Sequence, residues 1–171
     1  MRTVCCMGWI KDQKINSLAA ESVSQQNARE TAQSLQFMAF SRNGLITRLT
    51  SVGFASADAV YAVDSLDVNW NEQAAKKGTQ YLESSSFSRQ GLLEQLLFAG
   101  FTPEQAEYGV NASYGEDGDG TSQRNAVEKA RELLELASSR SNLIELLELA
   151  GFSNVDAVYA VDSLDVNWNE S

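Results

Sequence analysis

The stretch DAVYAVDSLDVNWNE occurs twice in this sequence, at Asp58–Glu72 and again, letter for letter, at Asp156–Glu170. Identity of this length within a chain of 171 residues indicates internal duplication and predicts an array of small structural units. A divergent third copy lies between the two and is anchored by Gly100-Phe101. This dipeptide corresponds to Gly53-Phe54 and Gly151-Phe152. The Gly-Phe pairs of the second and third copies are farther apart than those of the first and second. The extra residues fall in a predicted loop around Gly115 to Thr121.

Each copy begins with a predicted helix whose small and large apolar residues are seven positions apart. Two helical turns separate such positions, so they share one face. The positions are Ala28, Ala75 and Ala126 for the small residue, and Leu35, Leu82 and Leu133 for the large one.

A second helix is predicted after Ser41, Ser88 and Ser139, which are suited to the N-cap. Its apolar residues form one stripe, and a glycine then stands where a helix ends in the left-handed conformation. The stripe consists of Leu45, Ile46, Leu49 and Val52, of Leu92, Leu93, Leu96 and Ala99, and of Leu143, Ile144, Leu147 and Ala150.

The start of a third helix is clearest in the middle copy, where Thr102 is a good N-cap and Pro103 a good first residue. Glu104 suits the positive end of the helix dipole. The inward residues are predicted to be Ala59, Tyr61, Ala62, Val63 and their counterparts. The predicted fold is therefore all-α, with three tandem helix-turn-helix-like units of three helices. The predicted divisions are a tether at 1–26 and repeats at 27–72, 73–122 and 123–171.

The charge balance argues against nucleic acid as a partner. The chain has 13 Lys and Arg against 23 Asp and Glu, a formal net charge of -10. A DNA-reading helix needs Lys, Arg, Asn or Gln toward bases and phosphates. Leu49 to Ala75 contains no Lys or Arg and four acidic residues, and Ser141 to Ser171 contains none and six. We therefore expect no binding of nucleic acid.

The residue types also give no candidate for catalysis, a cofactor or a metal. The chain has no His, which removes His-based nucleophilic chemistry and His-ligated metals. The loop at Glu116–Gly120 is acidic, but Ser122 stands where a calcium-binding EF-hand needs glycine. Small three-helix units also offer little concave surface on which a substrate could bind. We expect a protein that is not an enzyme and holds no cofactor.

The start of the chain carries two adjacent cysteines, Cys5 and Cys6. Met1 to Ile10 is too short an apolar stretch for a secretory signal or a membrane span. The cysteines are either irrelevant to function or the remnant of a lipidation signal. Lys11 to Gln26 is polar and is interpreted as a tether or a weak helix.

The duplicated stretch supplies the candidate binding residues. Its acidic helix faces are either solvated or dock a basic partner. Its tryptophans either pack across the junction between units or anchor a partner. The candidates for partner binding are Asp64, Asp67, Trp70, Asp162, Asp165 and Trp168.

The middle copy, from Phe87 to Tyr108, resembles the Ltp family of host cell surface-exposed lipoproteins. A second stretch that resembles this family runs from Ala62 to Ala74 and continues into Lys76, Lys77 and Tyr81-Leu82. The motifs that carry the resemblance are Ser-x-x-Gly-Leu, Gly-Phe, Ala-x-Tyr and Asn-Trp-Asn, over about residues 27 to 171. The third copy departs from them, with Asn142 in place of glycine and no Phe before Ser139.

The resemblance implies tandem helix-turn-helix-like units on a Gram-positive cell surface or encoded by a prophage. It further implies superinfection exclusion, in which the protein blocks the uptake of incoming phage DNA by binding the tail tape measure protein. Family members are anchored through a lipidated Cys, so contact with the membrane is expected only through such an anchor. The alternative is a structural role, as a repeat-built spacer or surface scaffold without a single ligand.

Overall fold

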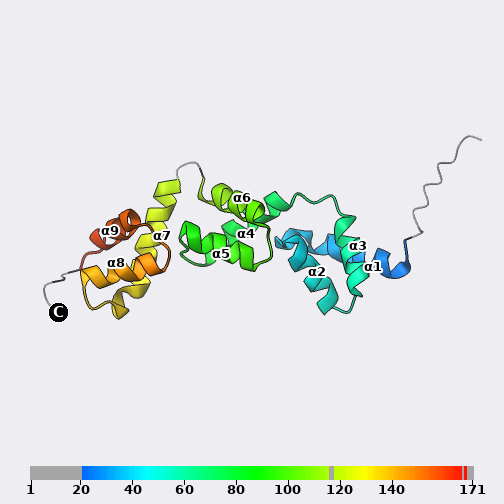
Figure 1. Cartoon of the computed structure of the whole chain (residues 1–171), viewed down its shortest axis with the longest axis horizontal. Coiled ribbons are helices and arrows are strands. Elements are labelled where there is room, and N and C mark those ends of the chain that lie inside the picture. The colour runs from blue at the N-terminus through cyan, green and yellow to red at the C-terminus, as the bar shows by residue number, and fades with distance from the viewer. Residues whose placement is uncertain (1–20, 116–117, 167, 169–171) are drawn as a thin grey trace, which may run out of the picture.

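The computed structural model describes residues 21–115, 118–166 and 168, and these contain helices but no strand. The helices follow one another in three sets of three along the long axis of the molecule (Figure 1). The prediction of an all-α array of three-helix units is confirmed.

Unit 1 consists of α1 (Val23–Leu35), α2 (Arg42–Ser51) and α3 (Ser56–Asp64). Unit 2 consists of α4 (Trp70–Ser84), α5 (Arg89–Phe98) and α6 (Pro103–Tyr114). Unit 3 consists of α7 (Gly118–Leu133), α8 (Arg140–Leu149) and α9 (Asn154–Asp162). Short 3-10 turns, η1 (Gln36–Met38) and η2 (Leu134–Leu136), follow α1 and α7.

Each unit has its own hydrophobic core. Two leucines of the second helix form its centre in every unit, and all six are fully buried: Leu45 and Leu49, Leu92 and Leu96, Leu143 and Leu147. Small residues of the first and third helices close over them, such as Ala28 and Ala62 in unit 1. The predicted stripe of the second helix is thus confirmed at these positions.

The predicted ends of the helices are confirmed in detail. Ser41, Ser88 and Ser139 are N-caps whose hydroxyls accept a hydrogen bond from the backbone N–H three residues on. Thr102 caps α6, with Pro103 as the first helical residue.

The second helices all end in the same left-handed turn. Gly53, Gly100 and Gly151 have φ of 106°, 85° and 83°. The N–H of the following phenylalanine donates to the carbonyl five residues back, as Phe101 does to Leu96 at 3.2 Å. This pair of features is the Schellman motif, and it folds Phe101 and Phe152 back into the cores, where both are buried.

Tyr61 does not lie where the sequence analysis placed it. Ala59, Ala62 and Val63 are buried as predicted, but Tyr61 and its counterparts Tyr108 and Tyr159 are exposed. Tyr61 is two residues from Ala59, about 200° around a helix, so its side chain leaves the face that Ala59 buries.

The first helix of unit 2 is also turned relative to the prediction. Ala74 and Gly78 are buried in place of the expected Ala75, which is only half-buried. The reason is the close approach of α4 to α6, where Gly109 of α6 lies directly against the backbone of Ala74. A glycine lets two backbones come nearer than side chains would allow.

Two segments outside the predicted helices of the repeats are partly helical. Lys11–Gln26 was interpreted as a tether or a weak helix, and its last residues belong to α1, which begins at Val23 after a capping box formed by Ser22 and Gln25. The predicted loop from Gly115 to Thr121 is shorter than expected, since α7 begins at Gly118. Cys5 and Cys6 lie outside the described residues.

Neighbouring units are joined by a hydrogen bond from the N-cap serine of one to the end of the second helix of the next. Ser41 Oγ donates to the carbonyl of Ala99 at 2.6 Å, and Ser88 Oγ donates to the carbonyl of Ala150 at 2.9 Å. Both serines are buried by this contact. Ser139, in unit 3, contacts no further unit among the described residues and is exposed.

We expect Ser88→Ala to lower the free energy of unfolding by about 2 kcal/mol, because the change removes both a helix cap and an inter-unit hydrogen bond. Ser139→Ala is the matched control, since that hydroxyl caps α8 without joining two units. It should cost only about 1 kcal/mol. Urea unfolding followed by circular dichroism measures both, and equal losses would contradict a stabilising role of the joint.

Candidate functional site

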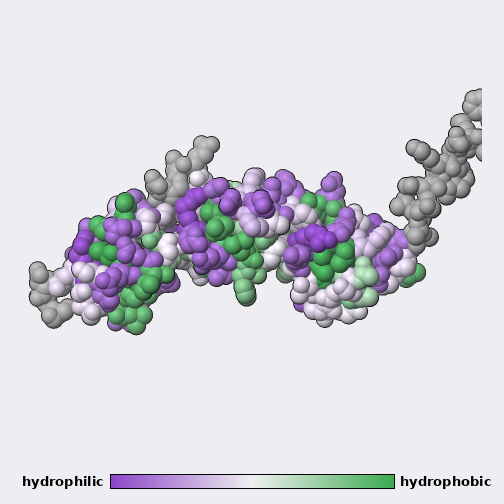
Figure 2. Space-filling view, in the orientation of Figure 1, coloured by the Kyte–Doolittle hydropathy of each residue, from purple (hydrophilic) through white to green (hydrophobic). Residues whose placement is uncertain are grey.

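The third helix of every unit exposes a stripe of three side chains, which we call the tyrosine stripe. Its positions are spaced i, i+4 and i+7, so they lie on one face of the helix. The stripes are Ala57, Tyr61 and Asp64 on α3, then Glu104, Tyr108 and Asn111 on α6, then Val155, Tyr159 and Asp162 on α9. The tyrosines are 38%, 47% and 49% exposed, and Val155 is 71% exposed. Figure 2 shows separate patches of hydrophobic residues on each unit, among hydrophilic ones.

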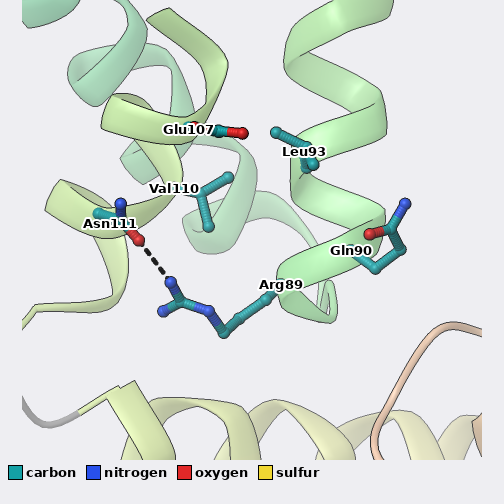
Figure 3. A pocket seen from close by; sticks show the side chains of 6 residues that line it. All are labelled: Arg89, Gln90, Leu93, Glu107, Val110 and Asn111. Atoms are coloured by element: carbon teal, nitrogen blue, oxygen red, sulfur yellow. Dashed lines mark hydrogen bonds between the residues drawn. The ribbon is translucent and has the colours of Figure 1, made fainter. Parts of the chain in front are cut away.

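An arginine from the start of the second helix holds the last residue of each stripe. Arg42 donates from Nε and Nη2 to the two carboxylate oxygens of Asp64, at 2.7 Å each. Arg140 makes the same contact to one oxygen of Asp162, at 3.0 and 2.6 Å. In unit 2, Arg89 Nη2 donates to Oδ1 of Asn111 at 2.5 Å (Figure 3). Every unit therefore ties its second helix to its third at the tyrosine stripe.

We expect Asp64→Asn to change the free energy of unfolding by no more than about 0.5 kcal/mol. Both side chains of the Arg42–Asp64 pair are more than a third exposed, and solvent screens such pairs strongly. Unit 2 already uses an asparagine at this position. Thermal unfolding measures the change, and a loss of several kcal/mol would mean that the pair is a main stabiliser of unit 1.

An open hollow of about 290 Å³ lies beside the stripe of unit 2. It is formed between α5 and α6 and is lined by Arg89, Gln90, Leu93, Glu107, Val110 and Asn111 (Figure 3). The carboxylate of Glu107 and the guanidinium of Arg89 both belong to its lining, so the hollow has charged groups of both signs.

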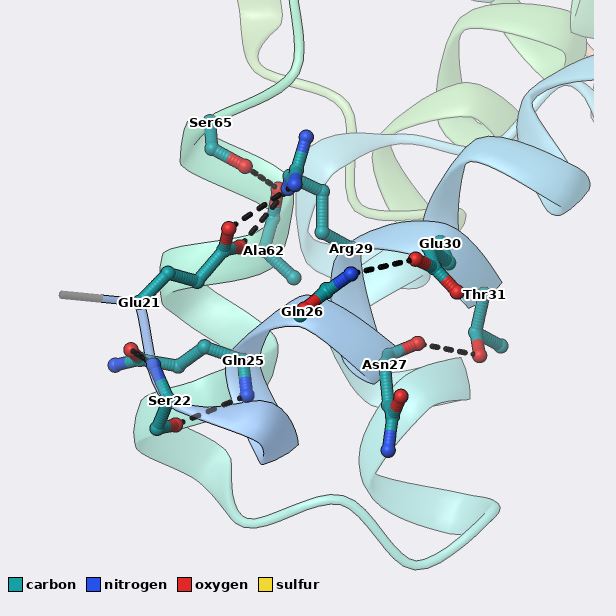
Figure 4. A network of polar contacts seen from close by, with 10 residues as sticks. All are labelled: Glu21, Ser22, Gln25, Gln26, Asn27, Arg29, Glu30, Thr31, Ala62 and Ser65. Carbon is teal, nitrogen blue, oxygen red and sulfur yellow. Dashed lines mark hydrogen bonds and ion pairs between the residues drawn. The ribbon is translucent and has the colours of Figure 1, made fainter.

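Two groups near the stripes have shifted pKa values. A hydrogen bond from its own backbone N–H, together with one from the Thr102 hydroxyl, lowers the pKa of Glu104. The carboxylate is therefore favoured in the folded protein, and its small stabilising effect is lost as the pH falls through this lowered pKa. In unit 1, hydrogen bonds from Arg29 to Glu21, at 2.9 and 3.0 Å, raise the pKa of the guanidinium (Figure 4).

The six candidate residues from the sequence fall into three pairs. Asp64 and Asp162 are exposed but bonded to Arg42 and Arg140. Asp67 and Asp165 are exposed and, within the part of the chain that the structure describes, form no ion pair. Trp70 and Trp168 are half-buried against the cores of units 1 and 3. The structure does not bring the six together, since Asp64, Asp67 and Trp70 lie at or after the end of α3, and Asp162, Asp165 and Trp168 lie at or after the end of α9.

Trp70 has a structural position at the junction of two units. It is the first residue of α4, in unit 2, but packs against the core of unit 1. Trp168 covers the core of unit 3 in the same way, although no further unit follows it in the described residues. Of the candidate residues, Asp67 and Asp165 thus stay accessible without an ion pair among the described residues, and the exposed tyrosines are accessible beside them in the sequence.

The sequence analysis missed the tyrosines as surface residues, although a signal was present. Tyr61, Tyr108 and Tyr159 hold the same place in all three copies, while the residue before each varies between Val and Glu. Ala59 and Val63 already account for the buried face of α3, four residues apart. A helical wheel drawn from these two residues turns Tyr61 outward.

The described residues contain no group of three or more Cys, Asp or Glu side chains that could hold a metal ion. None of their helices combines the length and the apolar character needed to cross a membrane.

The family described as host cell surface-exposed lipoprotein matches residues 24–66 and 69–112 of the chain, which is half of its length. The chain belongs to the Ltp lipoprotein family. The two segments that match this family contain α1–α3 and α4–α6, that is, units 1 and 2, with their tyrosine stripes at Tyr61 and Tyr108. Comparisons of this Ltp family chain with curated proteins and with solved structures gave no match.

Proposed function

We propose that the chain is a non-enzymatic binding module, displayed on the surface of a Gram-positive cell, that captures a basic segment of another protein through its tyrosine stripes. The observation that carries the proposal is the exposure of the same tyrosine on the third helix of all three units. The phage tail tape measure protein is the proposed partner, and superinfection exclusion is the proposed role.

The repeated tyrosine supports binding because an aromatic ring held on a rigid helix is a favoured interface residue. A residue that serves only its own core would not be exposed in every copy. The spacing by whole units also fits a long, extended partner, which can contact one stripe after another and gain affinity from several weak contacts.

The charges near the stripes support a basic partner. The stretch from Leu49 to Ala75 carries α3 and Asp67 without any Lys or Arg, and the stretch from Ser141 carries α9 and Asp165, also without any. Arg42 and Arg140 neutralise Asp64 and Asp162 but leave Asp67 and Asp165 available. Such exposed carboxylates steer association more than they add to affinity.

The test is to display the chain on a Gram-positive host and to measure plaque formation and DNA uptake across a panel of phages. We expect fewer plaques with phages whose tape measure protein is recognised, with adsorption to the cell unchanged. A variant with Tyr61, Tyr108 and Tyr159 changed to Ala should lose the protection. The matched control changes the exposed Phe37 and Phe98, which lie outside the stripes, to Ala and should keep it.

Charge reversal tests the electrostatic part separately. Changing Asp64, Asp67, Asp162 and Asp165 to Lys should weaken capture of a purified tape measure segment at least tenfold at low salt, and less at high salt. An unaltered affinity would remove the electrostatic argument. Unchanged infection by every phage in the panel would instead favour a structural spacer without a single ligand.

A further inference from the structure

The joint between units has two surfaces, each built from one end of a second helix. The start surface is a Phe-Ser-x-x-Gly sequence at the beginning of the helix, as at Phe40–Gly44 and Phe87–Gly91. The end surface is the C-cap residue of the helix and the glycine that follows it, as at Ala99-Gly100 and Ala150-Gly151. In both joints the serine hydroxyl of the start surface donates to the carbonyl of the end surface.

Glycines leave room for this contact on both sides, and the closest approach is on the end surface. A Cβ atom added to Gly100 would lie 3.0 Å from Ser41 Oγ, and one added to Gly151 would lie 2.8 Å from Ser88 Oγ. On the start surface, a Cβ on Gly44 would lie 3.0 Å from the same Ser41 Oγ and 3.5 Å from the carbonyl oxygen of Ala99. A larger residue at any of these positions therefore crowds the hydrogen bond.

The start surface of unit 3 lacks both features. Ser138 replaces the phenylalanine, and Asn142 replaces the glycine. Asn142 Oδ1 instead accepts a hydrogen bond from the N–H of Ser138 at 3.2 Å. Asn142 thus places a side chain where the two joined start surfaces have none, which makes the start surface of unit 3 unsuited to the same contact.

The end surface of unit 1 keeps its glycine but has no start surface against it in the described residues. Gly53 has φ of 106°, and a Cβ atom added there would meet nothing within 4 Å. Val52 is 50% exposed, whereas its counterparts Ala99 and Ala150 are half-buried in the joints. Among the described residues, two end surfaces are covered by a start surface and the end surface of unit 1 is not.

We propose that the Val52-Gly53 end surface docks a Phe-Ser-x-x-Gly helix start presented by another polypeptide, a helical unit of the same kind as those in this chain. Asn142 keeps two copies of this chain from supplying that helix start to each other. The contact is head-to-tail and would otherwise extend from copy to copy without closing. This proposal concerns a different surface from the tyrosine stripes and does not depend on superinfection exclusion.

The test uses the whole chain as both partners. One partner is the wild-type chain, which has a free end surface and a closed start surface. The other carries Ser138→Phe and Asn142→Gly, which rebuild the start surface of unit 2, and Gly53→Asn, which blocks its own end surface. Asn tolerates positive φ better than other side chains, so this block is the mildest available. Circular dichroism of each variant establishes that it is folded.

Sedimentation velocity of an equimolar mixture should show a complex of one chain of each kind. The mixture is measured at about 0.5 mM, because neighbouring units of one chain meet at effective concentrations of this order and the contact has to form here between separate chains. Each partner alone should sediment as a monomer. Adding Ser139→Ala to the rebuilt partner, which removes the donating hydroxyl, should weaken the complex about fivefold or more. A mixture that sediments as two monomers overturns the proposal. So does a complex that persists when the wild-type partner also carries Gly53→Asn.

Discussion

Phe101→Ala should lower the free energy of unfolding by about 3–5 kcal/mol, the usual loss when a phenylalanine is removed from a packed core. Phe101 is 4% exposed and lies in the core of unit 2 with Leu92 and Leu96. The Schellman turn at Gly100 holds its backbone in place, so neighbouring residues cannot readily move into the space that the ring leaves. Urea unfolding followed by circular dichroism measures the loss.

The matched control is Phe98→Ala, at the last residue of α5, three positions before Phe101. Phe98 is 90% exposed, so its removal should change the free energy of unfolding by less than about 0.5 kcal/mol. Similar losses at the two positions would mean that the turn after α5 does not direct Phe101 into the core. Because the core of unit 2 is separate from the other two, the transition should broaden or split as unit 2 unfolds first.

Gly109→Ala should lower the free energy of unfolding by about 3 kcal/mol, although alanine is the better helix former by about 1 kcal/mol. A Cβ atom at Gly109 would lie 2.9 Å from both the carbonyl carbon and the carbonyl oxygen of Ala74. These are backbone atoms, which no side-chain rotation can move, so α4 and α6 would have to separate. Chemical denaturation measures the net effect.

Gly120→Ala provides the comparison for helix propensity alone. Gly120 lies in α7, and a Cβ atom there would meet nothing within 4 Å. This variant should be more stable than the wild type by about 0.5–1 kcal/mol. If Gly109→Ala were stabilising to the same extent, the close approach of α4 and α6 would be wrong.

The features that were predictable from the sequence are those set by a few neighbouring residues. Serine N-caps, Thr102-Pro103 and the glycines after the second helices each act within one turn of helix, and all were placed correctly. The stripe of Leu45 and Leu49 follows from helical periodicity alone.

The features that escaped prediction depend on contacts between distant segments. The face that α4 buries is set by its close approach to Gly109 of α6. Aligning the three copies by their Gly-Phe pairs does not reveal this contact. The joint pairs Ser41 with a residue 58 positions away, and Ser88 with one 62 positions away. The ion pairs of Asp64 and Asp162 span 22 residues, so the sequence analysis counted both carboxylates as available to a partner. The exposed tyrosines were missed for a different reason, since apolar character was taken as a sign of burial.

The division of the protein into three independent cores has a mechanical consequence. A polypeptide held at one end and pulled at the other would lengthen in stages, because opening one unit breaks a joint but leaves the remaining cores intact. Each unfolded unit would increase the length of the chain and lower the tension, while the folded units could stay bound to a partner. The array would therefore dissipate force in steps before all units had unfolded.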